Sequence, residues 1–309
     1  MKKKTKENHS NYIKTSTSRK VFMVINVLVL TLLALSCVLP FVNLLAISFS
    51  EKTAVSANAV KLLPIGFNTA AYEFILSSNQ FLTALGISVK RTVLGVVINM
   101  ILVVFTAYPL SKSRQEFRSR QFFSWFFVIT MLFEAGLIPT YMIVRYTGLI
   151  DTIWALVLPG ALPVFNMLVV MNYMRSLPKE ISEAASIDGA NHMQILVRII
   201  LPVCLPTLAT VTLFSFVAHW NSWFDGMIYM NRAEHYPLQS YLQTIVINPE
   251  AFFRNQTNVS ESLGRYLSLT NARTTNAAQL FLATIPIMLI YPFLQKYFTS
   301  GMTMGSVKG

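Results

Sequence analysis

The stretch that decides the fold is EAASIDGANHMQILVRIILP, residues 183–202. It is a polar segment that lies between two long apolar runs. Gly189 permits the positive φ that ends a helix and turns the chain, and Pro202 disturbs any helix that reaches it. We therefore predict two short helices, at 178–188 and 191–201, joined by a turn at Gly189.

The composition indicates a chain that is solvated largely by lipid. Hydrophobic residues make up 54% of the 309 residues and charged residues only 12%, whereas about a quarter of a soluble domain is charged. In a soluble protein the net charge of +12 would suggest a nucleic-acid partner. Here the basic residues fall mainly between apolar runs, which favours an orienting role in a membrane and no nucleic acid. Cys37 and Cys204 form no metal-spaced pair, and both are expected to be small buried hydrophobes.

Six apolar stretches are long enough to cross a bilayer, whose core of roughly 30 Å needs about 20 helical residues. They are Val21–Ser48, Thr92–Leu110, Gln121–Val144, Thr152–Met174, Val203–Phe224 and Asn276–Gln295. Lipid offers no partners to open backbone groups, so each span is expected to be helical. The expected fold class is all-α, a polytopic membrane protein with six transmembrane helices.

The distribution of charge predicts which side of the membrane each loop faces. With the N-terminus inside, the inner segments 1–20, 111–120, 175–202 and 296–309 hold 16 Lys or Arg and five acids. The outer segments 49–91, 145–151 and 225–275 are longer, yet they hold nine Lys or Arg and seven acids. Because cytoplasmic loops carry the excess of positive charge, both termini and the stretch 183–202, between the fourth and fifth spans, are predicted to be cytoplasmic. Residues 81–85, in the first outer segment, are expected to be partly helical and to lie along the outer surface.

The spacing within residues 183–202 resembles the EAA loop, by which the membrane subunits of bacterial ABC importers bind their ATPases. The fixed positions of that loop are matched by Glu183, Ala184, Ala185, Gly189, Ile199, Leu201 and Pro202, with Asp188 and Ala190 inside the match. An ordinary cytoplasmic helix-turn-helix is the alternative. Each residue alone also has a plain structural explanation, since Ala184 and Ala185 are good helix formers and Glu183 can simply be solvated.

From about residue 80 onward the chain is similar to the carbohydrate permeases of the maltose-transporter type, specifically to the second of their two membrane subunits. The pair Trp220-Asn221 and the ending Val307-Lys308-Gly309 carry this resemblance. Residues 131–136, MLFEAG, and 236–239, YPLQ, resemble a subgroup linked to complex or acidic oligosaccharides.

The resemblance implies a multi-pass subunit of an importer in the bacterial cytoplasmic membrane. Its partners would be a second, homologous permease, two ATP-binding cassette ATPases and an extracytoplasmic solute-binding protein that delivers an oligosaccharide. The residues expected to couple this chain to the ATPases are Glu183, Ala184, Ala185, Asp188, Gly189, Ala190, Leu201 and Pro202. The tail residues Gly305, Lys308 and Gly309 are expected to contact the ATPases as well, and the outer segment 225–275 the binding protein.

The chemistry of this chain is expected to be mechanical rather than catalytic. No Walker A pattern occurs in the sequence, so ATP and Mg are expected on the partner ATPases. We expect no catalytic residue, metal or cofactor in this chain. Its expected division is a cytoplasmic arm at 1–20, the first span and outer loop at 21–75, the importer domain with its EAA loop at 76–298, and a cytoplasmic tail at 299–309.

Four residues are candidates for a substrate pathway. Glu134 is the only Asp, Glu, Lys or Arg within a predicted span, and such residues usually face a bundle interior or water. The alternative to a pathway role is that Glu134 is an interfacial carboxylate that pairs with a neighbouring helix. Trp220, Asn221 and Trp223 can stack on and hydrogen-bond a sugar, although aromatic residues at the end of a span are more often interface anchors. In importers of the maltose type the sugar site lies mostly in the partner permease, and His219 is expected to be a packed or hydrogen-bonded histidine.

Two other function classes remain open at this point. A permease for a non-sugar nutrient, such as an amino acid or phosphonate, would share the loop at 183–202, but Trp220-Asn221 and the ending Val307-Lys308-Gly309 argue against it. A polytopic membrane enzyme would need polar catalytic residues gathered at one membrane face, and the sequence shows no such cluster.

Overall fold

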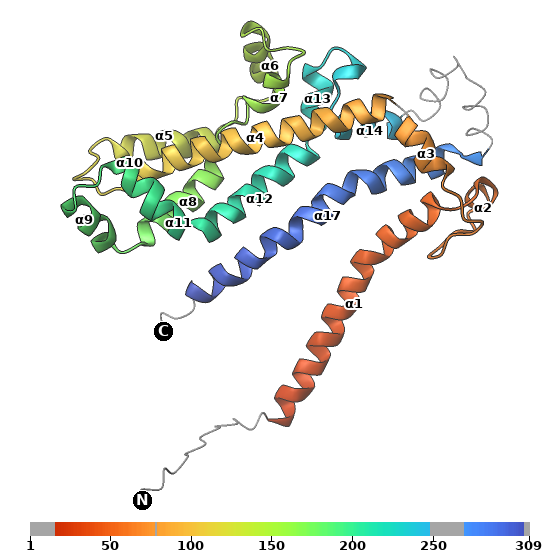
Figure 1. Ribbon diagram of the computed structural model, residues 1–309, viewed down its shortest axis with the longest axis horizontal. Helices are drawn as coiled ribbons and strands as arrows, with labels where there is room; N and C mark the ends of the chain where they lie inside the picture. The colour runs from red at the N-terminus through yellow and green to blue at the C-terminus, as the bar shows by residue number, and fades with distance from the viewer. Residues whose placement is uncertain (1–15, 78, 248–268, 306–309) are drawn as a thin grey trace, which may run out of the picture.

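Figure 1 shows the computed structural model of the chain, which describes residues 16–77, 79–247 and 269–305. Every regular element in these ranges is a helix, so the predicted all-α class is confirmed for them. The longest helices are α1 (Thr17–Ser48), α4 (Asn79–Ser111), α12 (Leu205–Asn221) and α17 (Ala272–Gly305). Of these, α4 packs on α12 and α12 packs on α17, and the three run side by side along the molecule (Figure 1).

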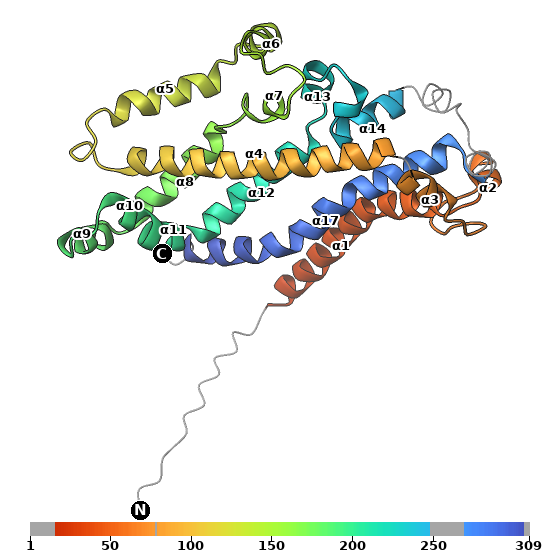
Figure 2. The ribbon, with the colours of Figure 1, turned by 45° about the horizontal axis from the view of Figure 1, so that its top comes forward.

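Shorter helices pack along this bundle and at its two ends (Figures 1 and 2). They are α2 (Lys52–Ser56), α3 (Ala70–Ser77), α5 (Arg120–Leu132), α6 (Leu137–Tyr146), α7 (Ile153–Val157), α8 (Val164–Ser176), α9 (Lys179–Ile187), α10 (His192–Ile195), α11 (Leu201–Val203), α13 (Phe224–Tyr229) and α14 (Leu238–Ile247). A π-helical turn, η1 (Leu196–Ile200), joins α10 to α11, and a 3-10 turn, η2 (Ala233–His235), precedes α14. Figure 2 shows α9 and α10 at one end of the bundle and α2, α3 and α14 at the opposite end.

The first and last predicted spans are continuous helices, as the sequence indicates. Helix α1 contains the whole predicted span from Val21 to Ser48, and α17 contains the one from Asn276 to Gln295. Both helices contain proline, which removes one backbone donor but does not end them. The expectation for the cysteines is half correct, because Cys204 is buried whereas Cys37 lies exposed on α1.

The second span is longer than predicted. Helix α4 begins at Asn79 rather than at Thr92, and its 33 residues correspond to about 50 Å of helix at 1.5 Å per residue. Residues 81–85 therefore form the first turns of α4 instead of a separate surface helix. Their buried members, Phe81 and Ala84, pack into a cluster at the α3–α14 end, so tertiary contacts extend the helix beyond its apolar run.

The third and fourth spans are interrupted, which corrects the prediction of single helices there. Helices α5 and α6 meet at an angle of 113° across residues 133–136, where Gly136 has a φ of +82° that glycine adopts without a Cβ penalty. The fourth span is split into α7 and α8 by residues 158–163. That gap holds Pro159 and Pro163, and a proline has no backbone N–H to donate within a helix.

The fifth span bends at its start. The run His192–Val203 meets α12 at an angle of 82°, and Cys204 is the residue between them. Among the described helices, three are each long and apolar enough to cross a membrane. The number of spans rises to as many as five if the α5–α6 pair and the pair formed by His192–Val203 and α12 each count as one span.

Two buried clusters hold the bundle together. One joins α4, α8 and the α9–α12 segment through Val103, Met167, Met171, Leu196 and neighbouring apolar residues. The other lies at the α3–α14 end and joins α3, α4, α12, α14 and α17. The first cluster reaches from the middle of α4 to α9, so the short helices at that end are extensions of the core.

Candidate functional site

Helices α9 and α10 form a bent segment, residues 179–195, that lies at one end of the molecule (Figures 1 and 2). The predicted turn is confirmed, because Gly189 has a φ of +82°. The next helix starts with a capping box, in which the Asn191 side chain accepts from the Gln194 amide and the Gln194 side chain accepts from the Asn191 amide, each at 2.9 Å. Such a box satisfies two backbone donors at a helix start, so the bend is fixed locally by its own residues.

One face of this segment is open and the other is anchored. Glu183, Ala184, Asp188 and Gly189 are exposed, and Ile187 is 86% exposed, which is unusual for an isoleucine next to a packed bundle. These residues form a surface on which another protein can dock.

Ala185 has a different role from the one expected. It is only 9% exposed and packs in the core cluster with Met174, Ile195 and Leu196, so of the two alanines only Ala184 is open to a partner. The small Ala185 side chain lets α9 lie against α8 and the α10–η1 run.

Leu201 and Pro202 lie where the segment enters the bundle. The five residues before them, Leu196–Ile200, form a π-helical turn, which is the kind of adjustment that accommodates a proline without its usual hydrogen bond. Leu201 is half-buried and Pro202 is exposed. Ala190, just after the turn, is also half-buried, so neither Ala190 nor Leu201 is freely available to a partner.

A second feature is an open cavity of about 580 Å³ between α4, α7, α8, α12 and α13. Its apolar lining includes Phe165, Phe214 and Tyr229, and its polar lining includes Asn99, Asn166 and Ser215. The three polar residues are at most 6% exposed. Polar groups buried within apolar spans are costly, and they commonly mark a transported ligand's path.

Hydrogen bonds fix the polar groups on the wall of this cavity. The Asn99 amide nitrogen donates to Gly95 O at 3.1 Å and to Ala161 O at 2.9 Å, and its oxygen accepts from His219 Nε2 at 3.2 Å. The expectation of a hydrogen-bonded His219 is thus confirmed. On the adjacent wall, Asn166 Nδ2 donates to Ser215 Oγ at 3.2 Å.

An ion pair lies on the same wall and joins distant parts of the chain. Arg91 of α4, 2% exposed, pairs through Nη2 with Asp225 of α13 and donates through Nη1 to Ser222 O at 3.0 Å. Asp225 Oδ1 also accepts from Ser222 Oγ at 2.8 Å and from the Gly226 amide at 2.9 Å. The positive charge of Arg91 is therefore neutralised within the chain.

The predicted pathway residues do not line this cavity. Trp220 is 2% exposed, donates from Nε1 to Ala283 O of α17 at 3.0 Å and stacks on Phe216, so it packs two helices together. Asn221 and Trp223 are exposed at the end of α12. Glu134 is exposed in the non-helical break between α5 and α6, so it is not within a continuous span.

The cavity residues that the sequence analysis missed are Arg91, Asn99, Asn166, Ser215 and Asp225. Asn99, Asn166 and Ser215 could have been found as uncharged polar residues within apolar stretches. The search for pathway residues in the predicted spans considered only Asp, Glu, Lys and Arg. Arg91 and Asp225 fell in predicted outer loops because each lies one residue beyond a predicted span.

The predicted contacts of the C-terminal tail with the ATPases and of the segment 225–275 with the binding protein fall partly outside the described residues. Gly305 is the last residue of α17, whereas Lys308 and Gly309 lie outside the described residues. The segment 225–275 is described only as far as residue 247 and again from residue 269. Its first part is held by Asp151, whose Oδ1 accepts from the Asn231 amide at 3.0 Å and contacts His235 Nδ1 at 2.8 Å.

No group of three or more His, Cys, Asp or Glu in the described ranges lies close enough together to hold a metal ion.

Comparison with known proteins identifies the family. Residues 88–224 match the model for the binding-protein-dependent transport system inner membrane component. The chain is 37% identical over 280 residues to the polygalacturonan/rhamnogalacturonan transport system permease protein YtcP of Bacillus subtilis strain 168, a match that covers 91% of this chain and 96% of YtcP. The chain belongs to the permease subunits of binding-protein-dependent ABC importers. The predicted resemblance is thereby confirmed, as is the assignment to a transport subunit rather than a membrane enzyme.

Other relatives agree with this assignment. Protein LplC of the same Bacillus strain is 34% identical to this permease over 94% of the chain and 96% of LplC. In the crystal structure of a bacterial ABC transporter involved in the import of the acidic polysaccharide alginate, one chain superposes on it with a TM-score of 0.82. That chain is 34% identical, and the match covers 92% of this permease and 99% of that chain. The two chains therefore share one fold along nearly their whole length.

Proposed function

We propose that this permease, together with a second homologous permease, forms the membrane pathway of an importer for acidic oligosaccharides. The observation that carries the proposal is the α9–α10 segment, which exposes Glu183, Ala184 and Asp188 while Ala185 anchors it to the core. An extracytoplasmic binding protein delivers the sugar, and two ATPase subunits drive its passage into the cytoplasm.

The α9–α10 segment is the contact through which the ATPases act. Glu180, Glu183 and Asp188 give its exposed face a negative charge, which suits basic side chains on a partner. Ile187 adds an exposed apolar anchor of the kind that stabilises a protein interface. ATP and Mg are held by the ATPases, because this sequence has no Walker A pattern. This chain itself holds neither a metal nor a cofactor in the proposal.

Six crossings account for the apolar helices. Helices α1, α4 and α17 cross in one piece, α5–α6 and α10–α12 cross as bent spans, and α7 with α8 provides the sixth crossing. The excess of positive charge in the predicted inner segments, taken together, supports a cytoplasmic position for both termini and for the α9–α10 segment. In this arrangement the break at residues 133–136 lies toward the outer side of the membrane, where the exposed Glu134 faces water.

The names of the relatives support an acidic sugar, and the lining of the cavity suits a sugar ring. YtcP is named for polygalacturonan and rhamnogalacturonan, and the similar crystal structure for alginate. The amide, hydroxyl and imidazole groups on the cavity wall, beside Phe214 and Tyr229, match the mix of hydrogen-bonding and apolar faces of a sugar ring. Arg91 is already paired with Asp225, so the sugar's carboxylates interact with other groups, including those of the partner permease.

The test is ATP hydrolysis by the reconstituted importer with its cognate binding protein. We expect oligogalacturonides to stimulate hydrolysis severalfold, and neutral malto-oligosaccharides of equal length to have no effect. Gly189→Val should abolish the stimulation, because a β-branched residue at φ +82° is strained and distorts the ATPase contact. Gly86→Ala, at an open helical position with nothing within 4 Å of an added Cβ, serves as the matched control.

The outcomes separate the parts of the proposal. Stimulation by neutral sugars alone would show that the acidic specificity is wrong. Lack of stimulation by any of a broad set of glycans would contradict sugar import. Normal stimulation in Gly189→Val would remove the α9–α10 segment from the coupling mechanism.

A further inference from the structure

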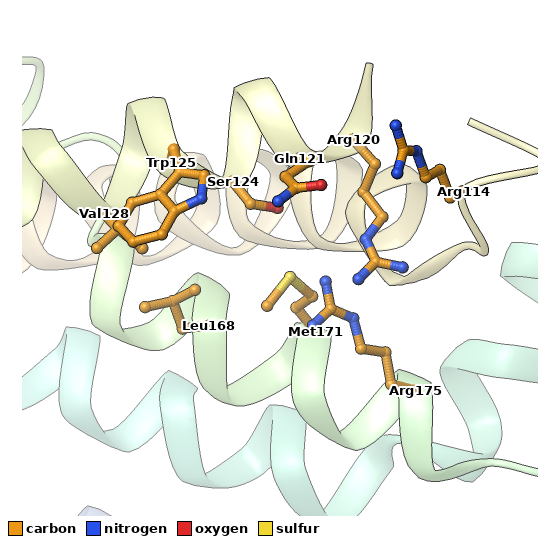
Figure 3. Close-up of a pocket in the computed structure, with 9 residues that line it drawn as sticks. All are labelled: Arg114, Arg120, Gln121, Ser124, Trp125, Val128, Leu168, Met171 and Arg175. Carbon is orange, nitrogen blue, oxygen red and sulfur yellow. The ribbon is translucent and has the colours of Figure 1, made fainter. Parts of the chain in front are cut away.

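A groove of about 440 Å³ lies between the start of α5 and the end of α8, separate from the cavity described above. At one end, Arg120 at the first residue of α5 and Arg175 in the last turn of α8 point toward each other, and Arg114 from the loop before α5 lies on the far side of Arg120 (Figure 3). The rest of the lining is mainly apolar and consists of Trp125, Val128, Leu168 and Met171, with Gln121 and Ser124 between the two parts (Figure 3).

The positive charge in this groove is not neutralised by the chain. Arg120 Nη1 donates to Lys112 O at 2.9 Å and Arg175 Nη2 donates to Leu110 O at 2.8 Å, so these two guanidinium groups are held in place by neutral carbonyls. Within the described residues, none of the three arginines has a carboxylate within ion-pair distance.

The nearby carboxylate of Glu116 is directed elsewhere. It accepts from the Ser113 amide at 2.8 Å and pairs with Lys112 at 3.7 Å. Arg120 and Arg175 therefore bring two positive charges, uncompensated among the described residues, to the same end of the groove. Like charges held this close favour an anion between them.

The surroundings of the groove indicate where such an anion comes from. Helix α5 has no buried residue, and it exposes Phe122, Phe126 and Ile129 next to the basic loop. The groove therefore lies where an apolar helix surface meets a cluster of cations. That is the depth of lipid headgroups, at which basic pockets between transmembrane helices bind anionic lipids.

We propose that this groove binds an anionic phospholipid. Its phosphate lies among Arg114, Arg120 and Arg175, since guanidinium forks bind phosphate oxygens in pairs, and one acyl chain lies along Trp125 and Leu168. Ser124, which also lines the groove, has a buried Oγ without a hydrogen-bond partner in the described structure. The inference rests on the proposed function only in placing the groove in the cytoplasmic leaflet.

Lipid in this groove is positioned to influence coupling. Arg175 also lines a neighbouring cleft of about 360 Å³ that includes Lys179 and Glu183 of α9. An ordered headgroup at Arg175 thus restrains the junction between α8 and α9, and with it the ATPase contact.

The experiment is native mass spectrometry of the assembled importer, titrated with phosphatidylglycerol or with phosphatidylcholine of the same acyl chains. We expect wild type to retain phosphatidylglycerol preferentially. Each lost arginine should weaken retention by about fivefold, the equivalent of about 1 kcal/mol per basic residue near an anionic membrane surface. The variants are Arg114→Gln, whose exposed side chain can be changed without disturbing the fold, and Arg120→Gln. Arg118→Gln is the matched control, because Arg118 is exposed in the same loop but does not line the groove.

Three results would overturn the inference. Equal retention of the two lipids would exclude an anion site. An equal loss in Arg118→Gln would mean that the loop attracts lipid only through its total charge. Displacement of the lipid by an oligogalacturonide would assign the arginines to the sugar pathway instead. The binding measurement needs no transport, so it stands or fails independently of the proposed function.

Discussion

At the scale of single residues, Gly95 of α4 fits tightly against His219, which lines the cavity. A Cβ built on Gly95 would lie 2.4 Å from His219 Nε2, so only glycine lets the imidazole pack against α4. The same ring nitrogen donates to the Asn99 oxygen. One small residue on α4 therefore determines where a polar group of α12 stands.

Gly95→Ala tests this fit. The added methyl group must displace the His219 ring, and overpacking of this kind costs about 1–3 kcal/mol. We expect a lower midpoint of thermal unfolding in detergent and weaker transport. Gly86→Ala lies on the same helix in open space, and it should be neutral or stabilising by up to about 1 kcal/mol. Equal stability of the two variants would show that His219 moves away at no cost.

At the scale of elements, the Arg91–Asp225 pair joins α4 to α13 across 134 residues of sequence. The side chain of Arg91 is 3% exposed and that of Asp225 is 23% exposed, so the guanidinium is almost fully desolvated. Its hydrogen bond to Ser222 O extends the contact to the end of α12. The pair thus fixes the position of three helices around the cavity.

Arg91→Gln should leave Asp225 without its cation and cost about 1–3 kcal/mol of unfolding free energy, less than for a fully buried carboxylate. The double variant Arg91→Gln with Asp225→Asn removes both charges and should lose less than the sum of the single losses. Lys90→Gln, at an exposed neighbouring position, is the control. Strict additivity of the two single changes would show that the pair contributes no coupling energy.

At the scale of the whole molecule, α1 stands apart from the bundle. Figure 1 shows its N-terminal half extending away from the other helices, and α17 is its main packing partner. Its buried residues are only Ala46, Ile47 and Ser48, at its C-terminal end. The exposed part of α1 is apolar, which suits a helix surrounded by lipid.

Two alanine substitutions compare the two halves of α1 in the assembled importer. Ile47→Ala removes a side chain that is 7% exposed and should cost about 2–5 kcal/mol, as for other buried isoleucines. Leu33→Ala changes a side chain that is 58% exposed and should cost less than about 0.5 kcal/mol. Thermal unfolding followed by size-exclusion chromatography measures both. An equal loss from Leu33→Ala would mean that another subunit covers this part of α1.

Much of the α9–α10 segment could be predicted from the sequence because its structure is local. The turn needs only the freedom of Gly189, and the second helix needs only the Asn191–Gln194 capping box, whose partners are three residues apart. The exposure of Glu183 also followed from local polarity. The inward orientation of Ala185 did not, because it depends on Met174 and Leu196 from neighbouring segments.

The cavity, by contrast, could not be read from the chain. Successive residues on a helix point about 100° apart, so the sequence did not show whether Trp220 or His219 faces inward. The packing of α12 between α4 and α17 decided it, turning Trp220 toward Ala283 and His219 toward Asn99. The sequence by itself determined an all-helical membrane permease with a sharp turn at Gly189, because apolar length and backbone freedom are local properties. Only the tertiary structure decided which polar groups meet, because Arg91, Asn99 and Asn166 find their partners on helices far along the chain.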